Sequence, residues 1–236
     1  MTPIRTAFKN LGRRAATLAG YDVTRRQPPG SHLRDIGHHA VYHDFKARGF
    51  APSLIFDVGA SDGWWTEDVR PIFPGARFVQ VEPRDTGLAG AVRAAVGATQ
   101  GAATLTDWGT GSTVLPVDPE GHQQITVPVT TLDRLAAQFG IPDFVKLDIE
   151  GLELEAIKGA TTLLGRTELF VIEVSLYRFS GRPQLHDVVA AMAAHGYFVY
   201  DIAGFIRRPW DGAVALMDLC FARTLRGSET EWHPRP

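Results

Sequence analysis

One segment near residue 60 sets the architecture: Leu54-Ile55-Phe56-Asp57-Val58-Gly59-Ala60-Ser61-Asp62-Gly63. An apolar run, an acidic residue and a turn of small residues follow one another in it. We expect a buried strand over 54–58 and a helix that begins at about Asp62 and runs to about Arg70. In open α/β sheets, a strand that ends in such a turn forms one wall of a ligand crevice at its carboxyl end. Gly59 lets the backbone turn tightly and lets a ligand approach it.

The same turn indicates which ligand the crevice would take. It is not a P-loop, because no Gly-Lys-Ser/Thr follows, and only Gly59 and Gly63 of a dinucleotide-binding glycine pattern are present. Asp57 and Asp62 make the turn acidic, which favours a cationic ligand over a pyrophosphate. Glu82 follows Asp57 by 25 residues at the end of the next strand, where an acid can accept both ribose hydroxyls of a nucleoside. Together these features favour the cationic nucleoside S-adenosylmethionine.

Outside this segment, short apolar runs alternate with helical stretches. Strands are expected at Arg77–Glu82, Val92–Val96, Phe144–Asp148, Leu169–Val174, Tyr197–Ile202 and Val214–Ala222, and helices at about 151–164 and Pro183–His195. Such alternation predicts an α/β fold with a mostly parallel sheet and helices on both faces. The Gly-, Thr- and Val-rich segment 98–130 is interpreted as an extended insert.

The first fifty residues differ from the rest in charge. They hold nine basic and three acidic residues, a net charge of +6, in a chain whose total is −2. Apolar residues recur every three or four positions over 4–18, which predicts a basic amphipathic helix. This helix either contacts a membrane surface or a partner through residues 1–20, or packs on its own domain. A second helix is expected at about 32–48.

These patterns predict a basic helical extension at 1–50, a Rossmann-like domain at 51–226 and a flexible tail at 227–236. The chain has 236 residues, 44% apolar and 21% charged, which is ordinary for a folded protein. No apolar run approaches the roughly 20 residues that span a bilayer, and the slightly acidic balance argues against nucleic-acid binding. The single cysteine, Cys220, excludes an internal disulfide. We expect a cytoplasmic protein, with peripheral contact at the inner membrane face as the option that the basic helix leaves open.

The most specific motif is Lys146-Leu147-Asp148-Ile149-Glu150-Gly151-Leu152-Glu153. Alternation along the predicted strand places Lys146 and Asp148 on one side, with Asp148 at the carboxyl end beside the crevice. Glu150 and Glu153 come at the start of the next helix. They either act in the crevice or are acids that the helix N-terminus favours.

In these residues the chain resembles the FkbM-type S-adenosylmethionine-dependent methyltransferases. The resemblance covers about 54–175 and rests on Phe56-Asp57-Val58-Gly59-Ala60, Val81-Glu82-Pro83, Thr131-Leu132-Asp133, the run from Lys146 to Glu153 with Lys158-Gly159-Ala160, and Ile172-Glu173. It implies a class I Rossmann-like fold with a seven-stranded sheet whose last strand is antiparallel. It also implies O-methylation, often of sugar hydroxyls in glycans, glycolipids or natural products. The short segment between Glu82 and Val96 departs from the family, because the usual helix has little room there.

The resemblance implies a role for each residue of the cofactor site. Asp57, Gly59, Ala60 and Gly63 would line the methionine side of S-adenosylmethionine, and Glu82 would hold the ribose. Asp148 would face either the methyl group or the acceptor, and it is therefore a candidate for both the cofactor site and the catalytic site.

Four residues are candidates for catalysis: Asp148, Glu150, Glu173 and His186. An alcohol is a poor nucleophile, so a base or a metal must assist it. The three carboxyl groups could bind Mg²⁺ through their oxygens, or one of them could act as a base with His186. We favour the base without a metal. His186 could instead be an ordinary surface residue at the start of a helix.

Several aromatic and histidine residues keep two interpretations. Trp64 and Trp65 supply at least one ring to the core, and the other could stack on adenine or a sugar. Trp108 in the insert could stack on a carbohydrate. His38 and His39 either cover the cofactor or are solvated.

Three functions remain open from the sequence. The favoured one is O-methylation of a small-molecule or saccharide acceptor. A nicotinamide-dependent sugar oxidoreductase is disfavoured by the missing third glycine. A binding protein without catalysis, docking through its basic helix, would keep the same fold. The sequence names neither the acceptor nor the oligomeric state, and a homo-oligomer remains open.

Overall fold

The computed structural model describes residues 40–107, 109–115, 121–178 and 181–225. The chain divides into two compact units, Met1–Asp35 and Ile36–Pro236, and all described residues belong to the second. The predicted amphipathic helix, His38, His39, Trp108 and the tail therefore lie outside the described residues. The predicted domain boundaries stay predictions. None of the helices in the described part of the chain has the length and apolar character needed to cross a membrane.

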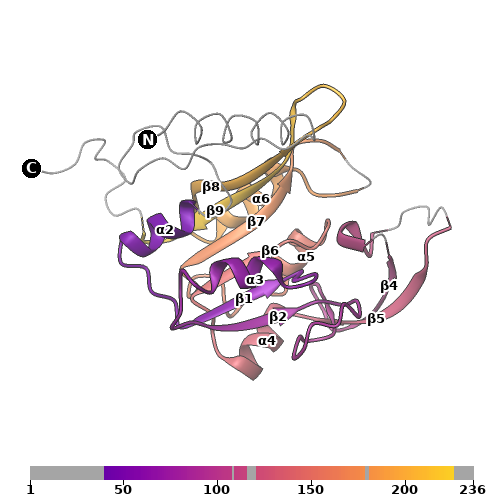
Figure 1. Ribbon diagram of the computed structural model, residues 1–236, viewed down its shortest axis with the longest axis horizontal. Helices are drawn as coiled ribbons and strands as arrows, with labels where there is room; N and C mark the ends of the chain where they lie inside the picture. The colour runs from indigo at the N-terminus through magenta and orange to yellow at the C-terminus, as the bar shows by residue number, and fades with distance from the viewer. Residues whose placement is uncertain (1–39, 108, 116–120, 179–180, 226–236) are drawn as a thin grey trace, which may run out of the picture. The chain divides into compact units, whose positions relative to one another are not determined.

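A six-stranded sheet forms the centre of the described fold (Figure 1). Its strands are β1 (Leu54–Val58), β2 (Arg77–Val81), β6 (Phe144–Leu147), β7 (Leu169–Ser175), β8 (Phe198–Arg207) and β9 (Val214–Ala222), in the order β2-β1-β6-β7-β9-β8. The first four strands in this order are parallel, and β9 runs antiparallel to both of its neighbours. Every residue of β1 and β6 is buried, as expected of parallel strands that are covered on both faces.

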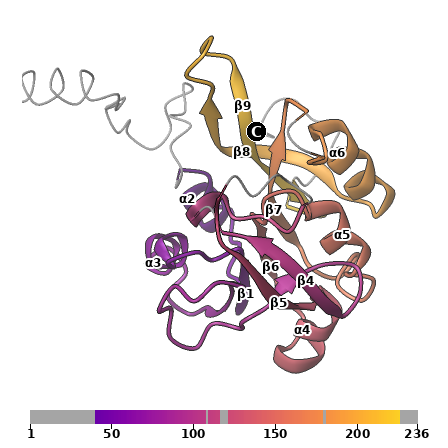
Figure 2. The same cartoon turned by 90° about the vertical axis from the view of Figure 1, so that its right-hand side faces the viewer.

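Helices cover both faces of this sheet (Figure 2). One face carries α2 (Ala40–Ala47) and α3 (Trp64–Val69), and the other carries α4 (Leu132–Phe139), α5 (Glu153–Lys158) and α6 (Leu185–Ala194). Successive residues of β1 enter different apolar clusters: Ile55 packs with the first pair of helices and Phe56 with the other three. This is the period-two alternation of a strand. The predicted α/β fold, a class I Rossmann-like arrangement, is confirmed.

α2 is tied closely to the sheet. Its Val41, Tyr42 and Phe45 are buried in the same cluster as Phe144. The Tyr42 hydroxyl accepts a hydrogen bond from the Trp65 indole nitrogen at 3.1 Å. The two rings meet edge to face with centroids 5.8 Å apart.

The family resemblance implied seven strands, whereas six are hydrogen-bonded in the central sheet of the described residues. At the expected position of the seventh, Val92 forms one parallel bridge with Val81. Of the predicted strand Val92–Val96, only the two residues of β3 (Ala95–Val96) form a strand. This strand belongs to a second sheet, where it pairs with β5. The chain between the bridged residues is too short for a helical crossover, which takes a dozen residues or more. No helix forms within 82–94, in agreement with the departure seen in the sequence.

The predicted insert builds a second, smaller sheet. It comprises β3, β5 (Gln124–Thr130) and the antiparallel β4 (Gly101–Thr106), in the order β3-β5-β4. Ala95, Leu105 and Val127 form its own apolar cluster. This sheet becomes one wall of the cavity described below.

Two of the motifs shared with the family form local contacts that stabilise the fold: Thr131-Leu132-Asp133 and Lys158-Gly159-Ala160. Thr131 caps α4, because its Oγ1 accepts a hydrogen bond from the Arg134 amide at 3.1 Å. Gly159 ends α5 where a Cβ would come within 2.3 Å of the Gly97 carbonyl oxygen. Its own carbonyl accepts a hydrogen bond from the Asp133 amide at 3.0 Å. α5 therefore ends at Lys158, earlier than the predicted 164.

Candidate active site

A cavity of about 300 Å³ opens at the carboxyl edge of the central sheet. One part of its wall is apolar and comes from the small sheet and the end of β2, with Val81, Ala95, Val96 and Leu105. Elsewhere the charged lining residues are four acids, Glu82, Asp148, Glu150 and Glu173, and two bases, Arg84 and Lys146. The excess of acidic groups favours a positively charged ligand.

The turn after β1 contributes Gly59 and Ala60 to the cavity wall. Their amides donate to the Val81 carbonyl at 2.9 and 3.0 Å, which fixes the turn against β2. Gly59 has a φ of +84°, and a Cβ there would lie 1.7 Å from the Asp148 carbonyl oxygen. Only glycine allows this approach between the ends of β1 and β6. Gly63 does not line the cavity; it precedes α3, where a Cβ would meet the Leu88 side chain.

Asp57 lies beneath this turn and does not line the cavity. It is fully buried, and its Oδ2 accepts a hydrogen bond from the Thr66 hydroxyl at 2.7 Å. Burial raises the pKa of Asp57, although Lys146 on the neighbouring strand counteracts this. Asp57 therefore supports the turn from within the fold. It does not reach the cavity, where the predicted contact with the cofactor would form.

Glu82 does line the cavity, at the end of β2. Its Oε2 accepts a hydrogen bond from the Ser61 amide at 2.9 Å. Its Oε1 accepts two from Arg84, from the amide at 3.0 Å and from Nε at 2.9 Å. Sequence reasoning missed Arg84, and the only local signal was a cation two residues after the acid. A carboxylate has about four acceptor positions, so these three donors leave Glu82 little capacity unless Arg84 moves.

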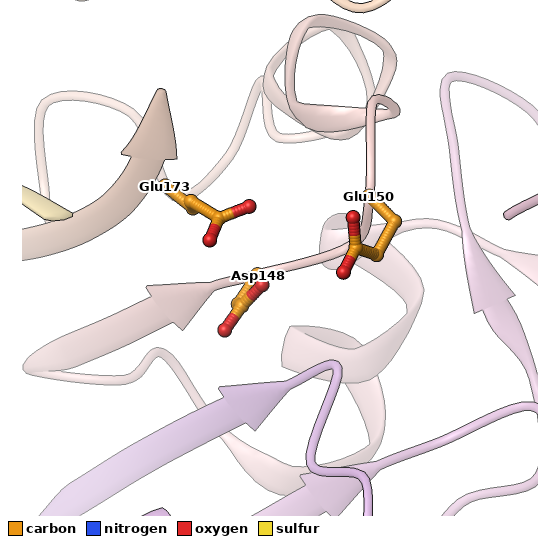
Figure 3. A group of neighbouring side chains, drawn as sticks. All are labelled: Asp148, Glu150 and Glu173. Carbon is orange, nitrogen blue, oxygen red and sulfur yellow. The ribbon is translucent and has the colours of Figure 1, made fainter. Parts of the chain in front are cut away.

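Three carboxyl groups meet at the opposite part of the wall (Figure 3). Asp148 follows β6, Glu150 lies on the next turn and Glu173 lies on β7. One oxygen from each lies within 4.8 Å of the other two. The parallel pairing of β6 with β7 brings these chain-distant residues to one edge. The sequence predicted this convergence, and the structure brings the three residues together.

Burial and the neighbouring acids raise the pKa values of two of these carboxyl groups, Glu150 and Glu173. Burial, and then Asp148 and Glu150, raise the pKa of Glu173 to about 9, so Glu173 is protonated at neutral pH. Burial also raises the pKa of Glu150, and Arg182 counteracts that shift. The cluster therefore holds both a proton donor and carboxylate acceptors.

Two cations compensate the cluster. Lys146 is buried on β6, and its Nζ donates to Asp148 Oδ2 at 2.8 Å. Burial alone would lower the pKa of Lys146, but Asp148 and Asp57 outweigh burial and raise it. Arg182, in the loop before α6, forms an ion pair with Glu150 and lies 3.6 Å from Glu173 Oε2 through Nη1. No local sequence signal could have found Arg182.

Two other candidates lie outside the cavity wall. Glu153 is buried, and its Oε1 accepts hydrogen bonds from the amides of Ile149 at 3.3 Å and Gly151 at 3.1 Å. It therefore holds the turn that carries Glu150, which has a φ of +56°. The His186 side chain is 71% exposed and lies 3.5 Å from Asp187 at the start of α6. The structure does not bring His186 to the three carboxyl groups.

Residues 57–199 match the family model described as the methyltransferase FkbM domain. This range covers more than half of the chain. The chain belongs to the FkbM methyltransferase family. The family, and with it the predicted enzyme class of S-adenosylmethionine-dependent methyltransferases, is confirmed. No curated protein matches the sequence.

Among solved structures, the chain is similar to an FkbM methyltransferase from Methylobacillus flagellatus, with 18% identity and a TM-score of 0.48 over 72% of this chain and 43% of that one. It therefore spans less than half of that protein. It is also similar to magnesium protoporphyrin IX methyltransferase from Synechocystis with bound S-adenosylmethionine, with 14% identity and a TM-score of 0.46 over 79% and 78% of the two chains. A third is 1,6-didemethyltoxoflavin-N1-methyltransferase from Burkholderia thailandensis, with 12% identity and a TM-score of 0.41 over 94% and 91%.

Proposed function

We propose that this FkbM-family enzyme methylates a hydroxyl group of a sugar-containing acceptor, such as a glycan, a glycolipid or a natural product. One observation carries the proposal. The cavity has an apolar wall beside the buried acid Glu82, and elsewhere the carboxyl cluster Asp148, Glu150 and Glu173. The first part fits a nucleoside, and the second can take a proton from a hydroxyl group.

The residues present fit S-adenosylmethionine. Gly59 and Ala60 give the cavity wall a turn of small residues that a ligand can approach, and Ala95, Val96 and Leu105 offer apolar contact to the adenine. Glu82 offers its carboxylate to the ribose once the side chain of Arg84 moves away from it. The acidic excess of the wall suits the positive sulfonium. When bound, S-adenosylmethionine supplies a methyl group whose carbon–sulfur bond breaks as an acceptor oxygen bonds to the carbon.

The base in this proposal is Asp148. Lys146 holds one of its oxygens at 2.8 Å, which fixes the orientation of the carboxylate at the cavity wall. Asp148 takes the proton of the acceptor hydroxyl as the new bond forms. Glu173, protonated because its pKa is about 9, donates a hydrogen bond that helps to position the acceptor. Glu150 and Arg182 complete the cluster as a second ion pair.

The same three carboxyl groups could instead hold Mg²⁺, since their oxygens converge. We propose proton transfer without a metal, because Lys146 and Arg182 already compensate the negative charge. After EDTA has been used to strip any bound metal from the protein, we expect the same rate of methyl transfer in EDTA as in millimolar MgCl₂. A rate that depends on added Mg²⁺ would favour the metal.

The main test uses the full chain and S-adenosylmethionine with an isotopically labelled methyl group. We expect titration calorimetry to show cofactor binding, and label to enter a glycan or glycolipid pool as an alkali-stable methyl ether. Alkali-labile label would identify a carboxyl acceptor and contradict the proposal. Cofactor binding without formation of S-adenosylhomocysteine, with any pool tried, would favour the binding protein without catalysis. Membrane contact through residues 1–20 and self-association stay predictions.

A further inference from the structure

Three residues in the wall of the main cavity, the space of about 300 Å³ described above, form a closed hydrogen-bond network: Ser61, Glu82 and Arg84. The Ser61 amide donates to Glu82 Oε2 at 2.9 Å, and Arg84 Nε donates to Glu82 Oε1 at 2.9 Å. Arg84 Nη2 donates in turn to the Ser61 hydroxyl at 3.1 Å. A ligand that binds to Glu82 therefore shares this carboxylate with Arg84.

The acceptor positions of Glu82 limit what can bind to it. Each carboxylate oxygen accepts about two hydrogen bonds. Oε1 already accepts two, from the Arg84 amide at 3.0 Å and from Arg84 Nε, whereas Oε2 accepts one among the described donors, from the Ser61 amide. A ligand with one hydroxyl group can therefore use Oε2 while Arg84 stays in place. A ribose that binds through both of its hydroxyls also needs Oε1, so the Arg84 side chain must leave.

A second acid lies within reach of the released guanidinium. Asp107 follows β4, and its Oδ1 is 4.0 Å from Arg84 Nη1, a distance that a small rotation of the arginine side chain would close. Hydrogen bonds from the Gly109 amide and then from the Ser112 hydroxyl lower the pKa of Asp107, so it is an anion at neutral pH. The backbone of Arg84 stays in place, because its carbonyl accepts a hydrogen bond from Arg93.

We propose that Arg84 selects a nucleoside that carries both ribose hydroxyls, because its side chain exchanges Glu82 for Asp107 only when such a ligand binds. This inference rests on the proposed contact between Glu82 and the ribose. The exchange connects the end of β2 to the segment after β4, whose Gly111 and Ser112 line the same cavity. The cost of releasing Arg84 lowers the apparent affinity for every ligand that uses both hydroxyls.

The first test measures the dissociation constant of S-adenosylhomocysteine for the full chain by titration calorimetry. Arg84→Met removes the guanidinium from a side chain that is still long and unbranched. The ligand then has nothing to displace, and its dissociation constant should fall by about fivefold. Arg77→Met is the control, because Arg77 is exposed on the same strand and does not line the cavity. It should leave the dissociation constant unchanged.

The second test replaces the acid that receives Arg84. Asp107→Asn keeps an acceptor for the Gly109 amide but loses the charge that attracts the guanidinium, so the dissociation constant should rise by about fivefold. In the double variant with Arg84→Met, the same substitution should have no effect, because the side chain through which it acts is missing. Asp85→Asn is the matched control, since Asp85 is exposed beside Arg84 and lies outside the cavity wall.

A third test compares two nucleosides by NMR titration, adenosine and 2′,3′-dideoxyadenosine. Arg84→Met should tighten adenosine binding by about fivefold and leave the affinity for the dideoxy nucleoside unchanged, because only adenosine has to displace the arginine. A purely structural role of Arg84 would change both affinities together. If the dideoxy nucleoside binds neither protein, the measurements with S-adenosylhomocysteine decide.

Three results would overturn the inference: a dissociation constant in Arg84→Met that rises or stays unchanged, equal effects of that variant on the two nucleosides, or an effect of Asp107→Asn that persists without Arg84. Glu82→Gln checks the contact on which the inference rests. If this variant binds S-adenosylhomocysteine like the wild type, the ribose contact is absent and the inference falls with it. None of these measurements needs an acceptor, so a failure of sugar methylation leaves their outcome unaffected.

Discussion

The two acidic edges of the main cavity are built differently. At the β1–β2 edge, Asp57 and Glu82 are separate carboxyl groups, both buried and held by hydroxyl, amide and guanidinium donors. At the β6–β7 edge, three half-buried carboxyl groups crowd within 4.8 Å and are compensated by Lys146 and Arg182. The first edge is arranged to keep a fixed shape. The second can exchange protons, because its groups cannot all ionise at neutral pH.

The largest effect should follow from Asp148→Asn at the second edge. Loss of a positioned base lowers kcat by about 10²–10⁴-fold. The dissociation constant of S-adenosylhomocysteine should change little, because this product lacks the methyl group and the positive charge that Asp148 would face. Stopped assays of methyl transfer, with calorimetry for binding, measure both. The matched control is Asp57→Asn at the first edge, and an equal loss of kcat there would break the distinction between the edges.

The next largest effect should follow from Gly59→Ala, which alters the turn at the first edge and lowers the stability of the protein. Gly59→Ala places a Cβ 1.7 Å from the Asp148 carbonyl oxygen, at a φ of +84°. We expect it to lower the free energy of unfolding by about 3 kcal/mol or more, as measured by urea denaturation. Gly49→Ala is matched in φ, at +89°, but has open space around it and should cost only about 1–2 kcal/mol. If the two variants lost similar amounts of unfolding free energy, the contact between the ends of β1 and β6 would not be tight.

A smaller effect concerns the proton on Glu173. Because its pKa is about 9, the side chain loses its proton and its ability to donate as the pH rises through that value. The rate of the wild type should therefore fall above pH 9, whereas Glu173→Gln, which keeps a donor that cannot ionise, should lack this fall. Parallel profiles of kcat against pH for the two proteins would refute the role of Glu173 as a donor.

The smallest effect should come from Glu153, which holds the turn between the edges. Burial raises its pKa from 4.5 to about 7, so the folded protein binds this proton more tightly than the unfolded chain. Stability from this group is therefore complete below pH 4.5 and is lost as the pH rises to about 7. Glu153→Gln keeps an acceptor for the Gly151 amide. It should match the wild type at low pH and exceed it by on the order of 1 kcal/mol at pH 8 in thermal or urea unfolding.

Much of the fold could be predicted, because its strands carry their own local pattern. β9 was predicted with its observed bounds, since Val214–Ala222 is a continuous apolar run with one charge. β8 extends to Arg207, five residues beyond the predicted end, because pairing with β9 continues where the local apolar pattern stops. The small sheet was missed because it depends on pairing between distant segments. α4 was missed although its local signals are present, since Thr131 caps it and Leu132, Leu135 and Ala136 form its buried face.

The residues of the site also fall into some that could be predicted from the sequence and others that could not. Asp148, Glu150 and Glu173 were predicted to meet, because parallel strands place their carboxyl ends at one edge. Arg182 comes from a distant loop, and no spacing in the sequence connects it with the cluster. His186 starts a helix as predicted, yet the direction of a surface side chain is not encoded by that position.

The short helix α2 has a practical consequence for work with this enzyme. Tyr42 accepts the hydrogen bond of Trp65, and Trp65 forms part of the cavity wall. A truncated protein that starts at residue 51 would lose this acceptor and uncover the rings of Trp65 and Phe144. A fragment that keeps this hydrogen bond and the buried face of α2 therefore begins at Ala40 or earlier.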